Sequence, residues 1–194
     1  MAPDADSPRL GDRNDFTYKE DAEGFACPLG AHVRRTNPRD VIAPYTVEQS
    51  LSMSEAHRLL RRGRMFGPPL FDPQLLDDPM APASAKALTE VHDDGEARGV
   101  HFFCVNASIK SQFEFVQQTW CNNPHFSGLN DNKDPIAGDN GHSDQPSSHM
   151  TIPRRPVRDR TSAVPRFVAV KGGAYLFMPS VTAVRFLATF GATQ

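Results

Sequence analysis

A histidine in a confined turn is the first candidate for chemistry. His32 follows a Cys-Pro dipeptide and precedes two arginines and a proline, so the backbone around its ring is restricted. A neutral imidazole held in one direction is what a metal or a heme iron requires from an axial ligand. A single histidine is also commonly a partly buried structural residue, so the residues by themselves leave both interpretations open.

An arginine beside a glycine turn is the second candidate. Arg61 lies in an arginine-rich run that leads into the apolar turn Phe66-Gly67-Pro68. From such a segment a guanidinium could stabilise negative charge that develops on a bound oxygen ligand. The run could also be a solvated basic patch or, with the arginines of residues 154–160, part of an anion or nucleic-acid binding module. The formal net charge of −2 argues against a nucleic-acid binder.

Composition excludes several other classes of protein. Cys27, Cys104 and Cys121 are widely spaced, which favours neither a zinc site nor a disulfide framework. No apolar run approaches the roughly 20 residues that span a bilayer, so we expect no membrane protein. The first residues lack the apolar segment of a secretion signal, which predicts a cytoplasmic location.

The elements that must position these side chains are short and joined by long connections, as 17 prolines and 13 glycines indicate. Residues 1–24 are polar and predict a loose tail, and residues 25–194 predict one domain with a surface loop at 70–97. The apolar run at 99–106 predicts a strand buried on both faces, with Val100 and Phe102 on the same face.

The remaining pattern is α+β. Residues 108–121 predict a helix with Ser108 as its cap, and 180–190 predict a second helix whose apolar side faces inward. Between them, 123–160 reads as an irregular loop, and 167–177 reads as a hairpin around two glycines. A helical turn is expected between Pro28 and Pro38, whereas 46–62 shows no clean helical stripe. This order of elements favours α+β over a doubly wound sheet.

Several segments together resemble one known family. Residues 27–39, Cys-Pro-Leu-Gly-Ala-His-Val-Arg-Arg-Thr-Asn-Pro-Arg, are similar to the proximal heme segment of the dye-decolorizing (DyP-type) peroxidases. The segments that follow in the same order are 60–68, 99–106, 112–120, 134–138 and the two-glycine hairpin that ends in Met178-Pro179-Ser180. The resemblance runs from about Asp15 to the end of the chain.

The resemblance implies a ferredoxin-like fold of the dimeric α+β barrel type, of which this chain would be the C-terminal heme-binding half. It implies heme b as cofactor, with His32 as the proximal iron ligand and Arg61 as the distal arginine. Four further residues would support the cofactor: Val100 and Phe102 on its distal side, Arg34 at a propionate, and Asp134 as the hydrogen-bond acceptor behind His32. The partners implied are hydrogen peroxide and a small organic reducing substrate such as a dye or a phenol.

One family motif is absent. The family carries a Gly-x-x-Asp-Gly motif whose aspartate moves protons during peroxide cleavage, but the chain has only Asp94-Gly95, with Val91 at the first glycine. We therefore expect most of the first ferredoxin-like domain to be missing and activity to be impaired, since an acid–base group contributes about 10²–10⁴-fold in rate. The alternative is a non-catalytic heme-binding fragment that needs a partner chain. Apolar area left uncovered by the missing domain predicts self-association into a homo-oligomer or poor solubility.

Overall fold

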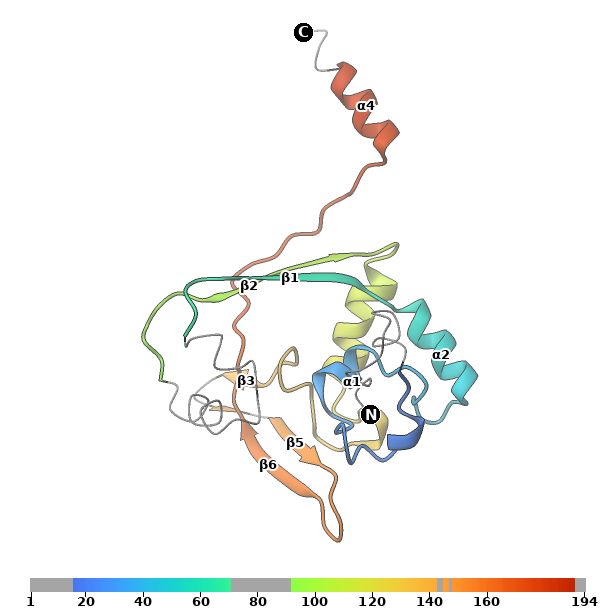
Figure 1. The fold of residues 1–194 in the computed structure, drawn as a ribbon, viewed down its shortest axis with the longest axis vertical. Coiled ribbons are helices and arrows are strands. Elements are labelled where there is room, and N and C mark those ends of the chain that lie inside the picture. Colours follow the sequence, from blue (N-terminus) through green and yellow to red (C-terminus); the bar gives the residue numbers. More distant parts are fainter. Residues whose placement is uncertain (1–15, 71–91, 143–144, 147, 191–194) are drawn as a thin grey trace, which may run out of the picture.

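Figure 1 shows the fold in a computed structural model, which describes residues 16–70, 92–142, 145–146 and 148–190. The described residues form short helices and three separate two-stranded antiparallel sheets, β1–β2, β3–β4 and β5–β6. The mixture of helix and sheet agrees with the predicted α+β class. No helix of the described part is both long and apolar enough to cross a membrane.

The N-terminal segment from residue 16 is folded, so the predicted loose tail is wrong for residues 16–24. Tyr18 is buried, and its backbone N–H donates to Asp40 Oδ1 at 2.7 Å. Asp21, at the end of the short helix η2 (Lys19–Asp21), is also buried. Polar pairing rather than apolar periodicity holds this segment, and such pairing leaves no sequence pattern. Residues 1–15 of the predicted tail lie outside the described residues.

Two helices follow, and one of them was not expected. The helical turn predicted before Pro38 is α1 (His32–Thr36). Helix α2 (Val47–Ala56) begins with a reciprocal capping box between Thr46 and Gln49. It has no apolar stripe because its buried residues are Ser50 and Ser54, whose hydroxyls bond backbone groups of earlier residues.

The strand predicted at 99–106 is β2 (Gly99–Val105), and it pairs with β1 (Leu60–Phe66). The prediction that both its faces are buried is wrong, since Val100 is 58% and Phe102 51% exposed. The reason is that, in the described part of the chain, β1 and β2 pair only with each other. Of the predicted loop at 70–97, residues 71–91 lie outside the described residues, and residues 92–97 form no helix or strand, as a loop would.

Cross-strand register divides the side chains of this sheet into two faces, because directly opposite residues point the same way. We define the inner face by Arg61, Gly63, Met65, Val100, Phe102 and Cys104. We define the outer face by Leu60, Arg62, Arg64, Phe66, Gly99, His101, Phe103 and Val105.

The predicted helix at 108–121 is present in π-helical form, as η4 (Lys110–Glu114) and η5 (Val116–Cys121). Ser108 caps it, since its hydroxyl oxygen accepts from the Ser111 N–H at 3.2 Å. Val116 and Trp120, four residues apart, are its buried apolar residues together with Cys121. The apolar core consists of Ile42, Val116, Trp120, Cys121 and Phe126, the last of these in the short helix η6 (Phe126–Gly128).

Beyond the core, the loop predicted at 123–160 is wrong in its second half. It contains β3 (Gly141–His142), β4 (Gln145–Pro146), β5 (Ser148–Ile152) and the start of β6 (Asp159–Val164). Buried Ser148 and Thr151 show that β5 packs through polar side chains, which hid it from a search for apolar alternation.

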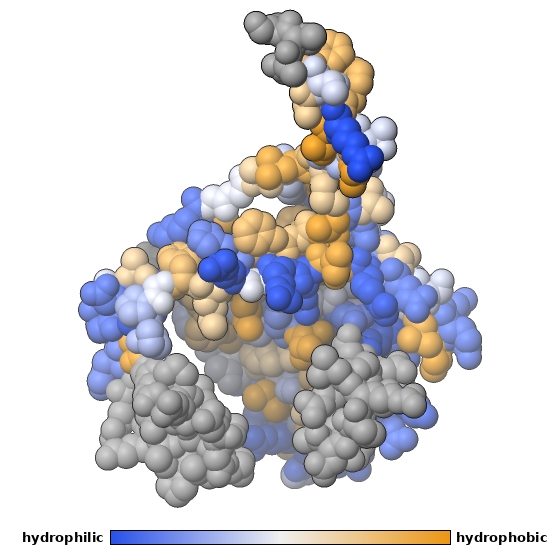
Figure 2. Space-filling model, turned by 45° about the horizontal axis from the view of Figure 1, so that its top comes forward, coloured by the Kyte–Doolittle hydropathy of each residue, from blue (hydrophilic) through white to orange (hydrophobic). Residues whose placement is uncertain are grey.

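The predicted hairpin at 167–177 is not formed, since residues 165–180 belong to no helix or strand. Helix α4 (Val181–Phe190) is present as predicted, but its apolar residues Val181, Val184 and Leu187 are exposed rather than inward-facing. Figure 1 shows α4 projecting beyond the β1–β2 sheet, and Figure 2 shows the apolar character of this projection. An isolated two-stranded hairpin is at best marginally stable, and the described residues offer α4 no surface on which to bury its apolar face.

Candidate functional site

His32 and Asp134 form the centre of the site, although 102 residues separate them in the chain. His32 is the first residue of α1, and its Nδ1 lies 2.9 Å from Asp134 Oδ2. The His32 side chain is 31% exposed, whereas the Asp134 side chain is fully buried. Because a carboxylate only accepts, Nδ1 carries the proton and donates it. The lone pair of a neutral ring then lies on Nε2, which has no hydrogen-bond partner in the described part of the chain.

The loop around Asp134 holds its carboxylate in one orientation. Oδ1 accepts from the backbone N–H groups of Ile136 and Ala137, both at 2.8 Å. Burial raises the pKa of Asp134, but the hydrogen bonds from His32 and Ala137 outweigh it and hold the pKa below its usual range. The group is therefore a carboxylate at neutral pH, and it fixes both the tautomer and the direction of the His32 ring.

Arg35 joins the helix of His32 to the loop of Asp134. Its guanidinium is completely buried and donates to the carbonyl oxygens of Trp120 at 2.6 Å, Asn123 at 3.0 Å and Asn132. Burial lowers the pKa of Arg35 to about 10, so it remains a cation at neutral pH. The sequence interpretation missed this residue, because adjacent arginines in a short polar segment give no sign that one of them is buried.

Arg34 is also buried, and its contacts are internal. Its guanidinium donates to Asp21 Oδ2 at 3.1 Å and to the carbonyl oxygens of Cys27 and Asp21, both at 2.8 Å. It also lies over the Tyr18 ring, 4.3 Å from the centroid. This placement differs from the propionate contact expected for Arg34, because its donors anchor the N-terminal segment to α1.

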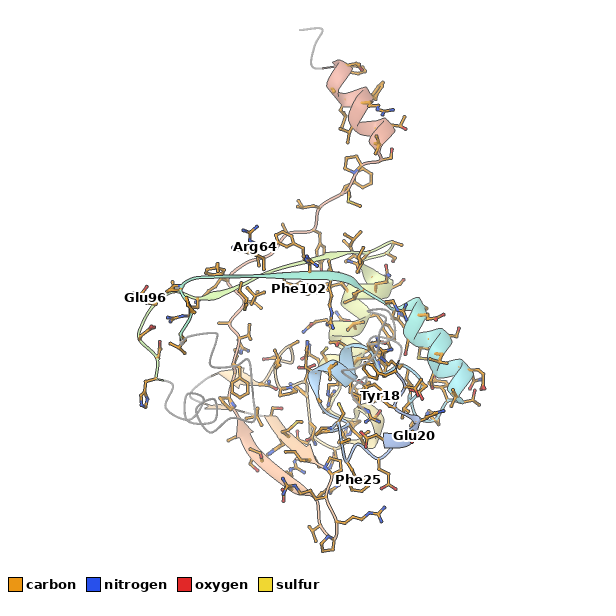
Figure 3. The ribbon with its side chains drawn as sticks, in the orientation of Figure 1. Tyr18, Glu20, Phe25, Arg64, Glu96 and Phe102 are labelled. Atoms are coloured by element: carbon orange, nitrogen blue, oxygen red, sulfur yellow. The ribbon has the colours of Figure 1, made fainter. Side chains whose placement is uncertain are left out.

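Arg61 lies on the inner face of the β1–β2 sheet, which faces α1. Its Nη1 donates to Thr36 Oγ1 at 3.4 Å, one turn after His32. Val100 and Phe102 share this face, and the Phe102 ring lies 6.3 Å from that of Phe113. In Figure 3, Phe102 is on the side of the ribbon that faces α1 and Arg64 is on the other side. The fold therefore brings Arg61, Val100 and Phe102 to the side of the sheet on which His32 lies.

Other arrangements suited to metals are not found. Among the described residues no three His, Cys, Asp or Glu side chains come together as a metal-binding group. A shallow hollow along α2, lined by Tyr45, Gln49 and Met53 among others, contains none of the predicted site residues. The candidate site in the described part consists of His32, the buried carboxylate of Asp134 and Arg61 on the inner face.

Comparison with known proteins identifies relatives of this chain, although no family model matches it. It is 33% identical over 180 residues to the multifunctional dye peroxidase DyP2 of Amycolatopsis sp., covering 90% of this chain and 35% of the relative. It is 29% identical over 206 residues to Peroxidase 2 of Mycetinis scorodonius, covering 95% of this chain and 36% of the relative.

Solved structures give the same result. The structure of DyP2 from Amycolatopsis sp. matches with a TM-score of 0.58 and 26% identity, over 82% of this chain and 32% of that one. A DyP-type peroxidase from Anabaena sp. matches with a TM-score of 0.55 and 25% identity, over 77% and 28%. The chain spans about a third of the length of the curated relatives it matches. In sequence over 90–95% of its length and in fold over 77–82%, this chain is therefore similar to the dye-decolorizing peroxidases.

Proposed function

We propose that this chain binds heme b through His32 Nε2 and takes part in the oxidation of small organic donors, such as dyes and phenols, by hydrogen peroxide. The observation that carries the proposal is the 2.9 Å contact between His32 Nδ1 and Asp134, which leaves Nε2 available on a partly exposed ring. We also propose that the separate sheets described above are parts of the ferredoxin-like fold that the family resemblance implies.

The residues around His32 suit a flat, apolar cofactor. Met65, Val100 and Phe102 present exposed apolar surface on the inner face of the sheet. Heme supplies an iron that binds peroxide and changes oxidation state. The contribution of the chain is to orient the imidazole and to increase its electron donation through the buried carboxylate of Asp134.

Arg61 is the residue we assign to the peroxide. A guanidinium remains charged across the pH range of enzymes, so it can stabilise negative charge on a peroxide oxygen. Its hydrogen bond to Thr36 is exposed and long, at 3.4 Å, so little free energy is lost when the side chain turns toward a ligand.

An acid–base group for proton transfer is not supplied by the inner face. Its six positions carry no carboxylate and no imidazole. This observation favours a second candidate function, heme binding without rapid turnover by this chain alone. A complementary group from another chain would then complete the reaction.

Heme titration tests the cofactor. We expect a Soret band with the unmodified chain, loss of that band in His32→Ala, and retention in the control His125→Ala, whose side chain is exposed. A Soret band of unchanged position and intensity in His32→Ala would refute the ligand assignment.

Peroxide-dependent dye oxidation by the heme-loaded protein then separates the two functions. Arg61→Ala should lower the rate by about 10²–10³-fold, as expected for loss of a group that stabilises developing charge. Arg62→Ala is the matched control, because it removes the neighbouring guanidinium from the outer face. Heme binding with no peroxide-dependent oxidation in any variant would select the non-catalytic function.

A further inference from the structure

The C-terminal arm, which we define as residues 165–190, carries many exposed apolar side chains. Leu176 is 84% and Phe177 89% exposed, and both precede the exposed helix α4. The exposed aromatic residues of the arm are Phe167, Tyr175, Phe177, Phe186 and Phe190. A soluble monomer rarely leaves a contiguous surface of this kind uncovered.

A second uncovered surface lies on the outer face of the β1–β2 sheet. Leu60 is 73% and Phe103 62% exposed there, and Phe66 and Val105 are also exposed. Within the described residues each strand pairs on one side only, so both strands keep an open edge of N–H and C=O groups. Residues 167–170 and 174–177 of the arm are rich in β-branched and aromatic residues, which suits them to add to such an edge.

The area available is enough for a stable dimer. A fully buried aromatic side chain removes about 150–250 Å² from water, so the five aromatic residues of one arm could bury roughly 700 Å² at their observed exposures. Two arms and the two faces that they cover would then bury roughly 2,800 Å² in total, which lies in the range of permanent homodimers.

The path of the arm favours a second copy over the chain's own body. Arg166 pairs with Asp139 at 2.8 Å, and the Tyr175 ring lies 6.3 Å from that of Phe113. The arm continues past the β1–β2 sheet and ends in α4, which projects clear of the sheet (Figure 1). Because arm and outer face belong to the same chain, two copies can satisfy each other through one two-fold interface.

Charge gives a further indication of how such an interface behaves. No acidic residue follows Asp159, whereas Arg166, Lys171 and Arg185 are in the arm and Arg62 and Arg64 are on the outer face. Apolar burial must therefore drive the contact against a weak repulsion between like charges, and added salt screens that repulsion.

We propose that the C-terminal arm of one copy covers the outer face of the β1–β2 sheet in a second copy, and that two copies exchange their arms reciprocally. The inner face, with Arg61, Val100 and Phe102, remains free for the proposed cofactor. The arrangement does not depend on heme, so its test is made without heme and its failure leaves the proposed function unaffected.

Light scattering and sedimentation measure the mass of the full chain at micromolar concentration. We expect a particle with twice the mass of the chain. Raising the salt concentration should leave the fraction of dimer unchanged or increase it. The variant with Leu176→Asp and Phe177→Asp, and the variant Phe103→Asp, should each be monomeric. Val157→Asp is the control, since Val157 is 74% exposed in the turn between β5 and β6 and should leave the dimer intact.

A mixture of the two monomeric variants tests the exchange itself. The arm variant keeps a native outer face and the Phe103→Asp variant keeps a native arm, so the mixture should form dimers that neither variant forms alone. A monomeric unmodified chain, a dimer that survives both sets of substitutions, or a mixture that stays monomeric would each overturn the proposal. Circular dichroism of each variant establishes that it is folded before its mass is interpreted.

Discussion

Replacing Asp134 with asparagine isolates the contact on which the site depends. The two side chains have nearly the same shape, but the amide removes the buried charge that accepts from His32 Nδ1 at 2.9 Å. A hydrogen bond to a charged group contributes about 1.5–3 kcal/mol, so we expect Asp134→Asn to lower the free energy of unfolding by about 2–3 kcal/mol. A typical domain has about 5–15 kcal/mol in total, so the variant should still fold.

A double-mutant cycle with His32→Ala separates this contact from the other bonds of Asp134. Each single substitution breaks the pair, so the double variant should lose less stability than the two single losses together, by about 1.5–3 kcal/mol. Denaturant unfolding can be followed by the fluorescence of Trp120, which is the only tryptophan of the chain and is buried in the core.

Asp139→Asn is the matched control for this cycle. Asp139 lies in the same loop as Asp134, but its side chain is 69% exposed where it pairs with Arg166. An exposed pair contributes at most about 1 kcal/mol, so coupling of Asp139→Asn with His32→Ala should be close to zero. A coupling below about 0.5 kcal/mol between His32 and Asp134 would refute our interpretation, because contacting residues in one hydrogen-bond network couple more strongly.

Three further predictions follow from the contacts of the fold. Arg35→Met leaves the buried carbonyl oxygens of Trp120, Asn123 and Asn132 without their donor. Because each unsatisfied group costs about 1–3 kcal/mol, the free energy of unfolding from thermal denaturation should fall by several kcal/mol. Gly67 has a φ of +91°, and a Cβ there would meet the Ala97 carbonyl oxygen, so Gly67→Ala should lower the free energy of unfolding by at least about 1–2 kcal/mol. Gly128→Ala is the control, because Gly128 also has a positive φ but no atom lies near its Cβ position. Stability should decrease on acidification below about pH 4, because the pKa of Asp134 is lower in the folded chain than in the unfolded chain. Such a carboxylate stabilises the fold fully above its unfolded pKa of about 3.9. This stabilisation is lost as the pH falls through the folded pKa. Unfolding measured from pH 7 to pH 3 should show a shallower decline for Asp134→Asn than for the unmodified chain.

Local sequence predicted those elements whose pattern is carried by neighbouring residues. The strand expected at 99–106, the helical turn expected between Pro28 and Pro38 and the helix expected at 180–190 are present as β2, α1 and α4. Helix α2 and the β5–β6 hairpin were missed because serine and threonine fill their buried positions. The hairpin at 167–177 was wrongly predicted, because two glycines permit a turn but do not by themselves stabilise the pairing of two strands.

His32 and Arg61 could be selected from the sequence alone, because a confined imidazole and an arginine beside a glycine turn are local features. Their surroundings could not. The pairing of His32 with Asp134 spans 102 residues, and the burial of Arg34 and Arg35 depends on carbonyl groups and a carboxylate that other segments supply. Apolar periodicity predicts which face of an element is buried, but it does not predict which polar group of a distant segment will lie against that element. Only the tertiary structure decides that pairing.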